Sequence, residues 1–328
     1  MSVTTTINAE HIRAATDTIK TIRGEIAKAV VGQDRVVDQV LIALLASGHV
    51  LIEGVPGLGK TLLVRALAKT FNGSFARIQF TPDLMPSDVT GHAMYDMKSE
   101  SFKIRKGPVF TNLLLADEIN RAPAKTQAAL LEVMQEQQVS IEGKPIRLDP
   151  PFMTLATQNP IEQEGTYPLP EAQLDRFLLK IMIDYPEQEE ENRLVHSVTS
   201  NQIGDSINVD AINPVVNAEH IVNLQKVTAH LTVDTRVSEY AVSIARQTRD
   251  WPGISIGAGP RGGIALIRAG RAAAILNGHD FVTPDDIKDI AIAGLRHRIV
   301  LSPEMEIEGQ TPDSILQNLL ESVAAPRI

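Results

Sequence analysis

A glycine-rich loop at residues 54–61 constrains the fold of this chain more than any other feature. Its sequence, Gly-Val-Pro-Gly-Leu-Gly-Lys-Thr, has the glycine, lysine and hydroxyl spacing of a phosphate-binding loop. An apolar stretch at residues 49–53 precedes the loop, and a helix-like pattern at residues 62–70 follows it. Glycines let backbone N–H groups turn inward around phosphates, and the positive end of the following helix points at the same anion. This strand, loop and helix predict a parallel α/β domain that binds a nucleotide.

The rest of the first half continues the alternation of strands and helices. Further apolar runs at residues 76–80, 112–116, 152–156 and 178–183 are typical of strands, and residues 125–137 have a helical pattern. Such alternation predicts a parallel sheet covered by helices on both faces. Two segments, 93–105 with a turn near 99–101 and 139–148 with a turn at 143–144, instead resemble inserted antiparallel hairpins.

The composition changes around residues 184–193, where the chain becomes acidic and the apolar strands stop. Pro186, followed by glutamates, can open a helix, so we interpret this segment as a hinge. Beyond it, residues 227–250, 261–277 and 284–297 have helical patterns. Thr283 and Pro284 give the last of these a strong start. We therefore expect an α/β domain over residues 1–185 and a smaller all-helical domain over residues 186–328.

Charge and composition exclude several classes of protein. Among the 328 residues, 31 Lys and Arg against 40 Asp and Glu give a net charge of −9, which disfavours broad coating of nucleic acid. Cysteine is absent, so thiol catalysis and thiolate metal sites are excluded. The longest apolar run, near residues 40–46, is far shorter than the ~18 residues of a membrane span. The amino terminus lacks the pattern of a signal peptide, and we expect a cytoplasmic protein without a membrane span.

A second polar group follows the strand predicted at residues 112–116. Asp117 and Glu118 come directly after it, and a phosphate-binding loop needs both a metal-holding acid and a group that activates water. We expect Thr61 and Asp117 to hold Mg²⁺ and Glu118 to polarise the attacking water. Two acids at a strand end can also simply cap the next helix, but the loop upstream favours the catalytic interpretation. Asn159 ends the next predicted strand and is expected near the γ-phosphate, although the Asn-Pro pair there also starts a turn.

Together these segments resemble the MoxR family of AAA+ ATPases over nearly the whole chain. The most specific matches are residues 54–61, 115–121 and 159–177, and Val31-Gly32-Gln33 matches the segment beside the adenine in such ATPases. The segment 81–88 with its following hairpin resembles the family's helix-2 insert, and residues 139–148 resemble its pre-sensor-1 hairpin.

The resemblance implies roles that spacing alone does not give. Asn159 matches sensor 1, Arg176 matches the arginine finger offered to a neighbouring subunit, and Arg261 matches sensor 2 on the lid domain. Family members usually have Ser before the Pro-Arg pair, whereas this chain has Gly259. The resemblance further implies ATP and Mg²⁺ as cofactors, a homo-hexamer, and a chaperone role toward a client, with a von Willebrand factor A domain protein as a candidate.

The expected site is therefore a set of three groups. The residues expected to bind ATP are Val31, Gly32, Gln33, Gly54, Val55, Pro56, Gly57, Leu58, Gly59, Lys60, Thr61, Leu62 and Arg261; those expected to hold Mg²⁺ are Thr61 and Asp117; those expected to be catalytic are Glu118, Asn159 and Arg176. Two alternatives stay open at this point. One is a small-molecule kinase with a phosphate-binding loop, and the other is a DNA-handling AAA+ motor, which the acidic balance disfavours.

Overall fold

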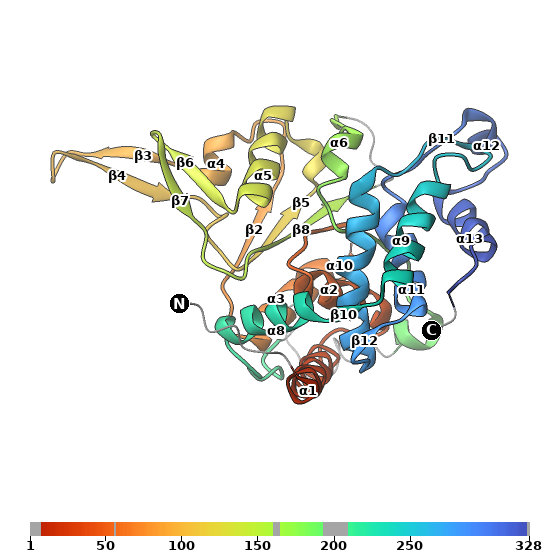
Figure 1. The fold of residues 1–328 in the computed structure, drawn as a ribbon. Helices are drawn as coiled ribbons and strands as arrows, with labels where there is room; N and C mark the ends of the chain where they lie inside the picture. The colour runs from red at the N-terminus through yellow and green to blue at the C-terminus, as the bar shows by residue number, and fades with distance from the viewer. Residues whose placement is uncertain (1–7, 56, 160–164, 193–208, 327–328) are drawn as a thin grey trace.

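The computed structural model describes residues 8–55, 57–159, 165–192 and 209–326 (Figure 1). Its centre is a five-stranded sheet in the order β2-β5-β8-β1-β9, and every pairing in it is parallel. The strands are β1 (Val50–Gly54), β2 (Phe75–Gln79), β5 (Leu113–Asp117), β8 (Met153–Gln158) and β9 (Leu179–Ile183). All five strands predicted from the sequence are confirmed to within about two residues.

Both faces of the sheet are buried, as the parallel prediction requires. Along β1, Val50 and Ile52 join one hydrophobic core, whereas Leu51 joins the other. This division follows from the two-residue period of a strand, which sends alternate side chains to opposite faces. One core is covered by helices α1 (Ala9–Ile26), α2 (Asp34–Leu45) and α3 (Lys60–Thr70), and the other by α5 (Ala124–Glu136).

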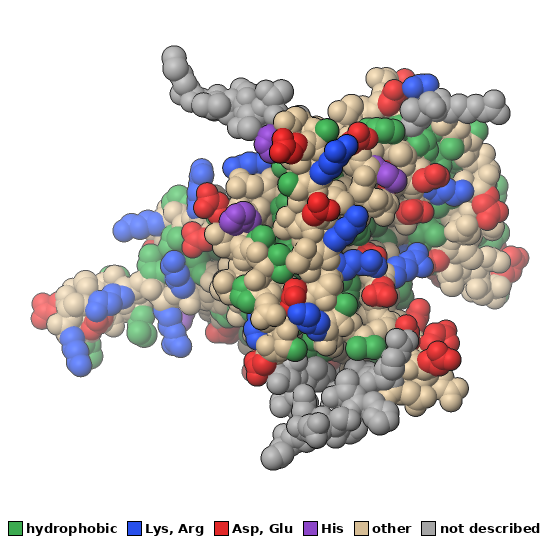
Figure 2. All heavy atoms as spheres, turned by 90° about the horizontal axis from the view of Figure 1, so that it is seen from below, with side chains coloured by type: hydrophobic (Ala, Val, Ile, Leu, Met, Phe, Trp, Pro, Cys, Tyr) green, Lys and Arg blue, Asp and Glu red, His purple; other side chains and the backbone are tan. Residues whose placement is uncertain are grey.

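Two antiparallel hairpins lie outside the sheet, as the sequence predicted. One pairs β3 (Gly91–Asp96) with β4 (Ser101–Lys106) and extends away from the body, next to the short helix α4 (Pro86–Thr90) (Figure 1). Met97 at its tip is 87% exposed and Phe102 is 74% exposed. Figure 2 shows basic and hydrophobic side chains on this projection. The other hairpin pairs β6 (Gln138–Ile141) with β7 (Lys144–Arg147).

The C-terminal part is helical, apart from two short strand pairs in its described residues. Its helices are α8 (Ala218–His230), α9 (Thr235–Gln247), α10 (Pro260–Asn277), α11 (Pro284–Leu295), α12 (Pro303–Ile307) and α13 (Pro312–Ser322). The strand pairs are β10 (Thr232–Val233) with β12 (Phe281–Val282), and β11 (Ile254–Ile256) with β13 (Val300–Leu301). Among the described helices, none has the length and hydrophobicity that crossing a lipid bilayer requires.

One predicted helix is wrong in its extent. Residues 227–250 do not form a single helix, because α8 ends at His230 and α9 begins at Thr235. The β-branched pair Thr232–Val233 between them forms β10, and the Asp234 side chain caps α9 by accepting a hydrogen bond from the Arg236 backbone N–H at 2.8 Å. The break could not be predicted from the apolar pattern, because both helices and the strand between them contribute apolar residues to the same core.

The helical part shares a hydrophobic core with the α/β part. Residues of α10, including Leu266 and Ile275, belong to the same buried cluster as Ile19 of α1 and Leu41 of α2. The Thr16 hydroxyl of α1 also donates a hydrogen bond to the Ile275 carbonyl at 3.1 Å. Residues 188–192 are helical, in keeping with the helix start expected after Pro186. The domain division at residue 185 stays a prediction.

A buried histidine fixes the start of β1. His49 is buried, its Nε2 lies 3.0 Å from the Met134 carbonyl of α5, and its Nδ1 accepts the Thr154 backbone N–H at 3.0 Å. Burial lowers the pKa of His49 from 6.5 to about 4. A second proton would occupy Nδ1 and break the bond to Thr154, so the folded protein holds this imidazole neutral.

This geometry predicts acid sensitivity. The unfolded chain binds a proton at His49 below about pH 6.5 and the folded chain does not, so this contribution to stability is lost as the pH falls from 6.5 toward 4. Between pH 7.5 and pH 5 we expect His49 to account for a loss of about 2 kcal/mol in the free energy of unfolding. Urea titrations of the wild type and His49→Gln at both pH values measure it. His92→Gln, on the exposed β3–β4 hairpin, is the control; equal pH dependence in all three proteins contradicts the assignment.

Candidate active site

The predicted phosphate-binding loop joins the end of β1 to the first residue of α3. Gly57 (φ 88°) and Gly59 (φ 72°) both lie in the left-handed region that favours glycine. A Cβ atom at either position would meet no heavy atom within 4 Å, so the space beside the loop is open. Glycine is therefore favoured at these two positions by the positive φ angle of the backbone, and not by a lack of space for a side chain. Pro56 lies outside the described residues.

Lys60 lies at the N-terminus of α3, with its ammonium group turned back over the loop. Its Nζ donates a hydrogen bond to the Gly54 carbonyl at 2.5 Å. Burial lowers the pKa of Lys60, while the nearby carboxylates of Asp117, Glu118 and Glu53 act in the opposite direction. The site thus places a half-buried lysine among several acids, and Thr61 follows directly on the same helix turn.

Asp117 and Glu118 are held by a threonine that the sequence analysis missed. The hydroxyl of Thr157 on β8 donates to Asp117 Oδ1 at 2.6 Å and accepts the Glu118 backbone N–H at 2.9 Å. Glu118 itself has a left-handed backbone (φ 55°, ψ 51°), which turns the chain sharply after β5. The acidic pair therefore depends on the neighbouring strand for its position.

The edge strand β2 supplies two more partners that the sequence analysis missed. Arg77 donates to Asp117 Oδ2 at 2.5 Å, and the Gln79 amide donates to Glu118 Oε2 at 2.8 Å. Arg121, three residues after Glu118, also reaches Oε2 at 3.2 Å. Arg77 and Gln79 are two residues apart, so they project to the same face of the strand. Their polarity at the end of an otherwise apolar strand was the signal available in the sequence.

These groups surround one cavity of about 300 Å³ at the carboxyl edge of the sheet. Asn159, which follows β8 and is 9% exposed, lies on its wall. The described residues that line it are Gly54, Gly57, Gly59, Lys60, Thr61, Leu62, Arg77, Gln79, Asp117, Glu118, Thr157, Gln158 and Asn159. The structure thus brings together most of the residues predicted to bind the phosphates, the metal and the attacking water.

The Val31-Gly32-Gln33 segment lies beside the loop without lining this cavity. The Gln33 side chain donates a hydrogen bond to the Leu58 carbonyl at 2.9 Å, which joins the start of α2 to the loop. Gly32 (φ 74°) packs so closely that a Cβ there would lie 2.8 Å from Glu190 Cβ. The half-buried segment therefore lies between the loop and residues 188–192.

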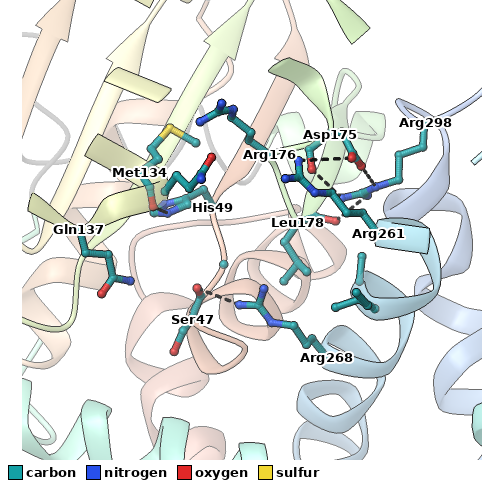
Figure 3. A pocket seen from close by; sticks show the side chains of 14 residues that line it. Ser47, His49, Met134, Gln137, Asp175, Arg176, Leu178, Arg261, Arg268 and Arg298 are labelled. Carbon is teal, nitrogen blue, oxygen red and sulfur yellow. Dashed lines mark hydrogen bonds and ion pairs between the residues drawn. The ribbon is translucent and has the colours of Figure 1, made fainter. Parts of the chain in front are cut away.

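Arg176 and Arg261 lie elsewhere, on a second cavity of about 410 Å³ (Figure 3). Arg176 Nη1 donates to the Leu131 carbonyl at 3.0 Å, and Arg261 Nη1 lies 3.6 Å from Asp175 Oδ2. Arg298 pairs with the other oxygen of Asp175 at 2.7 Å. No described residue lines both this cavity and the one that contains Lys60. A single chain therefore does not bring these two arginines to its own phosphate-binding loop.

Comparison with known proteins identifies the fold family. The family described as "ATPase family associated with various cellular activities (AAA)" matches residues 49–179, and the AAA lid domain matches residues 246–319. The chain is 40% identical to Chaperone MoxR1 of Mycobacterium tuberculosis, over 98% of this chain and 85% of the relative. The chain belongs to the MoxR family of AAA+ ATPases.

Two further relatives agree with this membership. The uncharacterized protein YeaC of Bacillus subtilis is 46% identical over 92% of each chain. The crystal structure of a candidate ATPase from Cytophaga hutchinsonii superimposes with a TM-score of 0.89 at 41% identity, covering 97% of this chain and 98% of that one. This MoxR-family chain is an ATPase, and its C-terminal helical part corresponds to the AAA lid.

Loss of the Lys60 ammonium group is expected to remove nucleotide binding. In Lys60→Ala the phosphates lose the ammonium group of Lys60, and we expect the affinity for a fluorescent ATP analogue to fall by about two orders of magnitude. Equilibrium titration measures this affinity. Lys69→Ala, at the other end of α3, is the control. Unchanged affinity in Lys60→Ala contradicts the assignment of the loop.

A substitution at Glu118 is expected to distinguish nucleotide binding from hydrolysis. Glu118→Gln keeps the size of the side chain but removes the basic carboxylate that is expected to polarise water. ATP should therefore bind normally while its hydrolysis falls by roughly 10²–10⁴. Phosphate release measured beside analogue binding distinguishes the two effects. A wild-type rate in this variant would mean that Glu118 serves only as the cap of the following turn.

Proposed function

We propose that this chain hydrolyses ATP with Mg²⁺ as part of a homo-oligomeric ring and uses the reaction to remodel or activate a partner protein. The observation that carries the proposal is the separation of the two cavities. Lys60 and Glu118 line one, whereas Arg176 and Arg261 line the other. A second chain that presents its arginine cavity to the Lys60 cavity of the first would complete the site.

The residues of the Lys60 cavity divide the work of hydrolysis. Lys60 and the loop backbone bind the phosphates of ATP, and Asn159 is positioned on the wall for the γ-phosphate or its water. Glu118 polarises the attacking water. The hydrogen bond from Gln79 orients the carboxylate of Glu118 and restricts its rotation.

The residues present fit a magnesium ion bound together with ATP. Thr61 and Asp117 supply a hydroxyl and a carboxylate oxygen in the same cavity, and Mg²⁺ prefers oxygen ligands. Mg²⁺ is commonly held by one or two protein oxygens together with the phosphates of its nucleotide. When bound, the ion would neutralise charge on the phosphates.

Arg176 and Arg261 are proposed to act on the neighbouring subunit's ATP. Asp175 connects them, because it precedes Arg176 in the chain and forms an ion pair with Arg261. An arginine supplied in trans stabilises the charge of the transferring phosphoryl group. We place Arg261 in this pair because of its cavity, although the resemblance alone implied only a sensor on the lid.

The proposal also specifies a chaperone role, the number of subunits in the ring and the kind of client protein. The name of the relative Chaperone MoxR1 supports a chaperone role. The homo-hexamer and a von Willebrand factor A domain client come from the family resemblance alone. A cytoplasmic location and the absence of nucleic acid as a partner stay predictions.

Arg176→Ala tests the ring and the chemistry together. We expect ATP affinity to change little, because Arg176 does not line its own chain's Lys60 cavity, and hydrolysis to fall by roughly 10³–10⁵. Mixing Arg176→Ala with Lys60→Ala should restore part of the activity, since an intact Lys60 site then meets an intact Arg176. Steady-state phosphate release over a range of protein concentrations measures both effects.

The control is Arg13→Ala, an exposed arginine on α1, which should keep wild-type activity. If subunits exchange, no activity returns on mixing, and the wild-type rate per chain does not depend on concentration, the trans arrangement is wrong. The small-molecule kinase would then be the better proposal.

A further inference from the structure

A groove lies on the lid between helices α9 and α10. Its volume is about 500 Å³, and its floor is apolar, formed by Val242 and Ala245 of α9 and by Ile264 and Ile267 of α10. Val242 is 47% exposed and Ile264 is 58% exposed. An aliphatic floor this exposed between two long helices is typical of a surface that another molecule covers.

A glycine of α10, Gly263, lines the groove opposite Val242 of α9. A Cβ atom at Gly263 would lie 3.8 Å from Val242 Cγ2, at ordinary contact distance. Close packing therefore does not demand a glycine here, unlike at Gly270, where a Cβ would lie 2.4 Å from Ile287 Cδ1. The missing side chain at Gly263 leaves the hollow open.

Four arginines, called here the rim arginines, border the groove. They are Arg246, Arg249, Arg268 and Arg271. Three of them donate to backbone carbonyls: Arg249 Nε to Ala258 at 2.9 Å, Arg271 Nε to Leu231 at 3.1 Å, and Arg268 Nη2 to both Ala46 at 2.6 Å and Ser47 at 3.1 Å. Each guanidinium group keeps further N–H donors for a ligand.

The rim arginines are not neutralised by ion pairs with carboxylates of the described residues. Among the described residues, seven other arginines form ion pairs with carboxylates, and none of the rim arginines does. No Asp or Glu of the described part of the chain lines the groove. The whole protein has a net charge of −9, so four arginines around one groove with no acidic residue in its described lining form a local concentration of positive charge.

We propose that the groove docks an amphipathic helix of a partner protein, with apolar side chains along one face and carboxylates along its flanks. The apolar floor accepts side chains spaced three and four residues apart, and the rim arginines pair with the flanking carboxylates. A phosphate ion alone would leave the floor uncovered. Nucleic acid would favour aromatic side chains for stacking, and the described lining has none.

This proposal depends on the proposed function in one respect: it assumes that the molecule bound in the groove is a partner protein. The groove lies outside the Lys60 cavity, but Ile264 and Arg268 also line the cavity that contains Arg176 and Arg261. The variants that test docking are therefore made at Arg246 and Gly263, which line the groove and not that cavity, so docking and nucleotide hydrolysis can be measured separately. Failure of the ring test at Arg176 would leave the docking result standing, and failure of docking would leave the ring intact.

The probe is a fluorescein-labelled peptide of about 15 residues, long enough for a few helical turns, with Leu on one face and Glu on the other. A counterpart carries Lys in place of every Glu. Fluorescence anisotropy with the full chain should detect binding of the Glu peptide and at least about tenfold weaker binding of the Lys peptide. Equal binding of the two peptides, or no binding of the Glu peptide, overturns the proposal.

Two variants locate the binding. Arg246→Glu reverses one rim charge and should weaken binding about tenfold, whereas Lys226→Glu, the same charge change on exposed α8, should not. Gly263→Leu fills the hollow with the arginines intact and should weaken binding as strongly, while Gly263→Ala, which fits at contact distance, confirms that the position tolerates a side chain. Circular dichroism and ATP hydrolysis should be unchanged in Arg246→Glu.

Two results overturn the assignment. Unchanged peptide affinity in both Arg246→Glu and Gly263→Leu places the peptide elsewhere on the molecule. In the other result, the Glu peptide does not bind, and light scattering gives a smaller assembly mass for Arg246→Glu than for the wild type. The groove is then a contact between copies of this chain.

Discussion

The buried hydroxyl of Thr157 connects the parts of the active site. It is 1% exposed, donates to Asp117 and accepts from the Glu118 backbone, so both of its hydrogen-bonding functions are used inside the protein. This pair of bonds joins the ends of β5 and β8, the two strands that carry the acidic pair and Asn159. Hydrogen bonds in such a low-dielectric position define geometry strongly, because leaving either group unpaired would be costly.

The parallel sheet then collects the remaining groups at one edge. Because β1 pairs with β8, and β8 with β5, the phosphate-binding loop and the acidic pair leave the sheet on the same side. Charge is balanced locally: Arg77 lies against Asp117, Arg121 against Glu118, and Lys180 against Glu53 at 2.8 Å. This balance explains how several carboxylates can gather around one half-buried lysine.

The lid carries a second set of positive charges with a different purpose. Its arginines are connected to the α/β part by specific contacts, as when Arg298 pairs with Asp175 and donates to the Phe177 carbonyl at 2.7 Å. Because α10 shares a core with α1 and α2, the arginine cavity and the lid groove are held in fixed relation to the sheet. We infer that phosphate chemistry takes place at the sheet edge, that the cavity with Arg176 faces a neighbouring subunit, and that the lid groove takes a partner helix. The last two surfaces adjoin, since Ile264 and Arg268 line both.

The sequence by itself determined the local elements and the residues that chemistry demands. The loop around Lys60, the pair Asp117-Glu118 and the five strands were all readable, because glycine spacing and apolar periodicity are encoded within short segments. The tertiary structure alone decided the strand order, the support of the acidic pair by Thr157 and Gln79, and the distance of Arg176 and Arg261 from Lys60. It also divided residues 227–250 into two helices. These features depend on which distant segments pack together, and an isolated threonine or glutamine carries no local signal of the neighbour that it will meet.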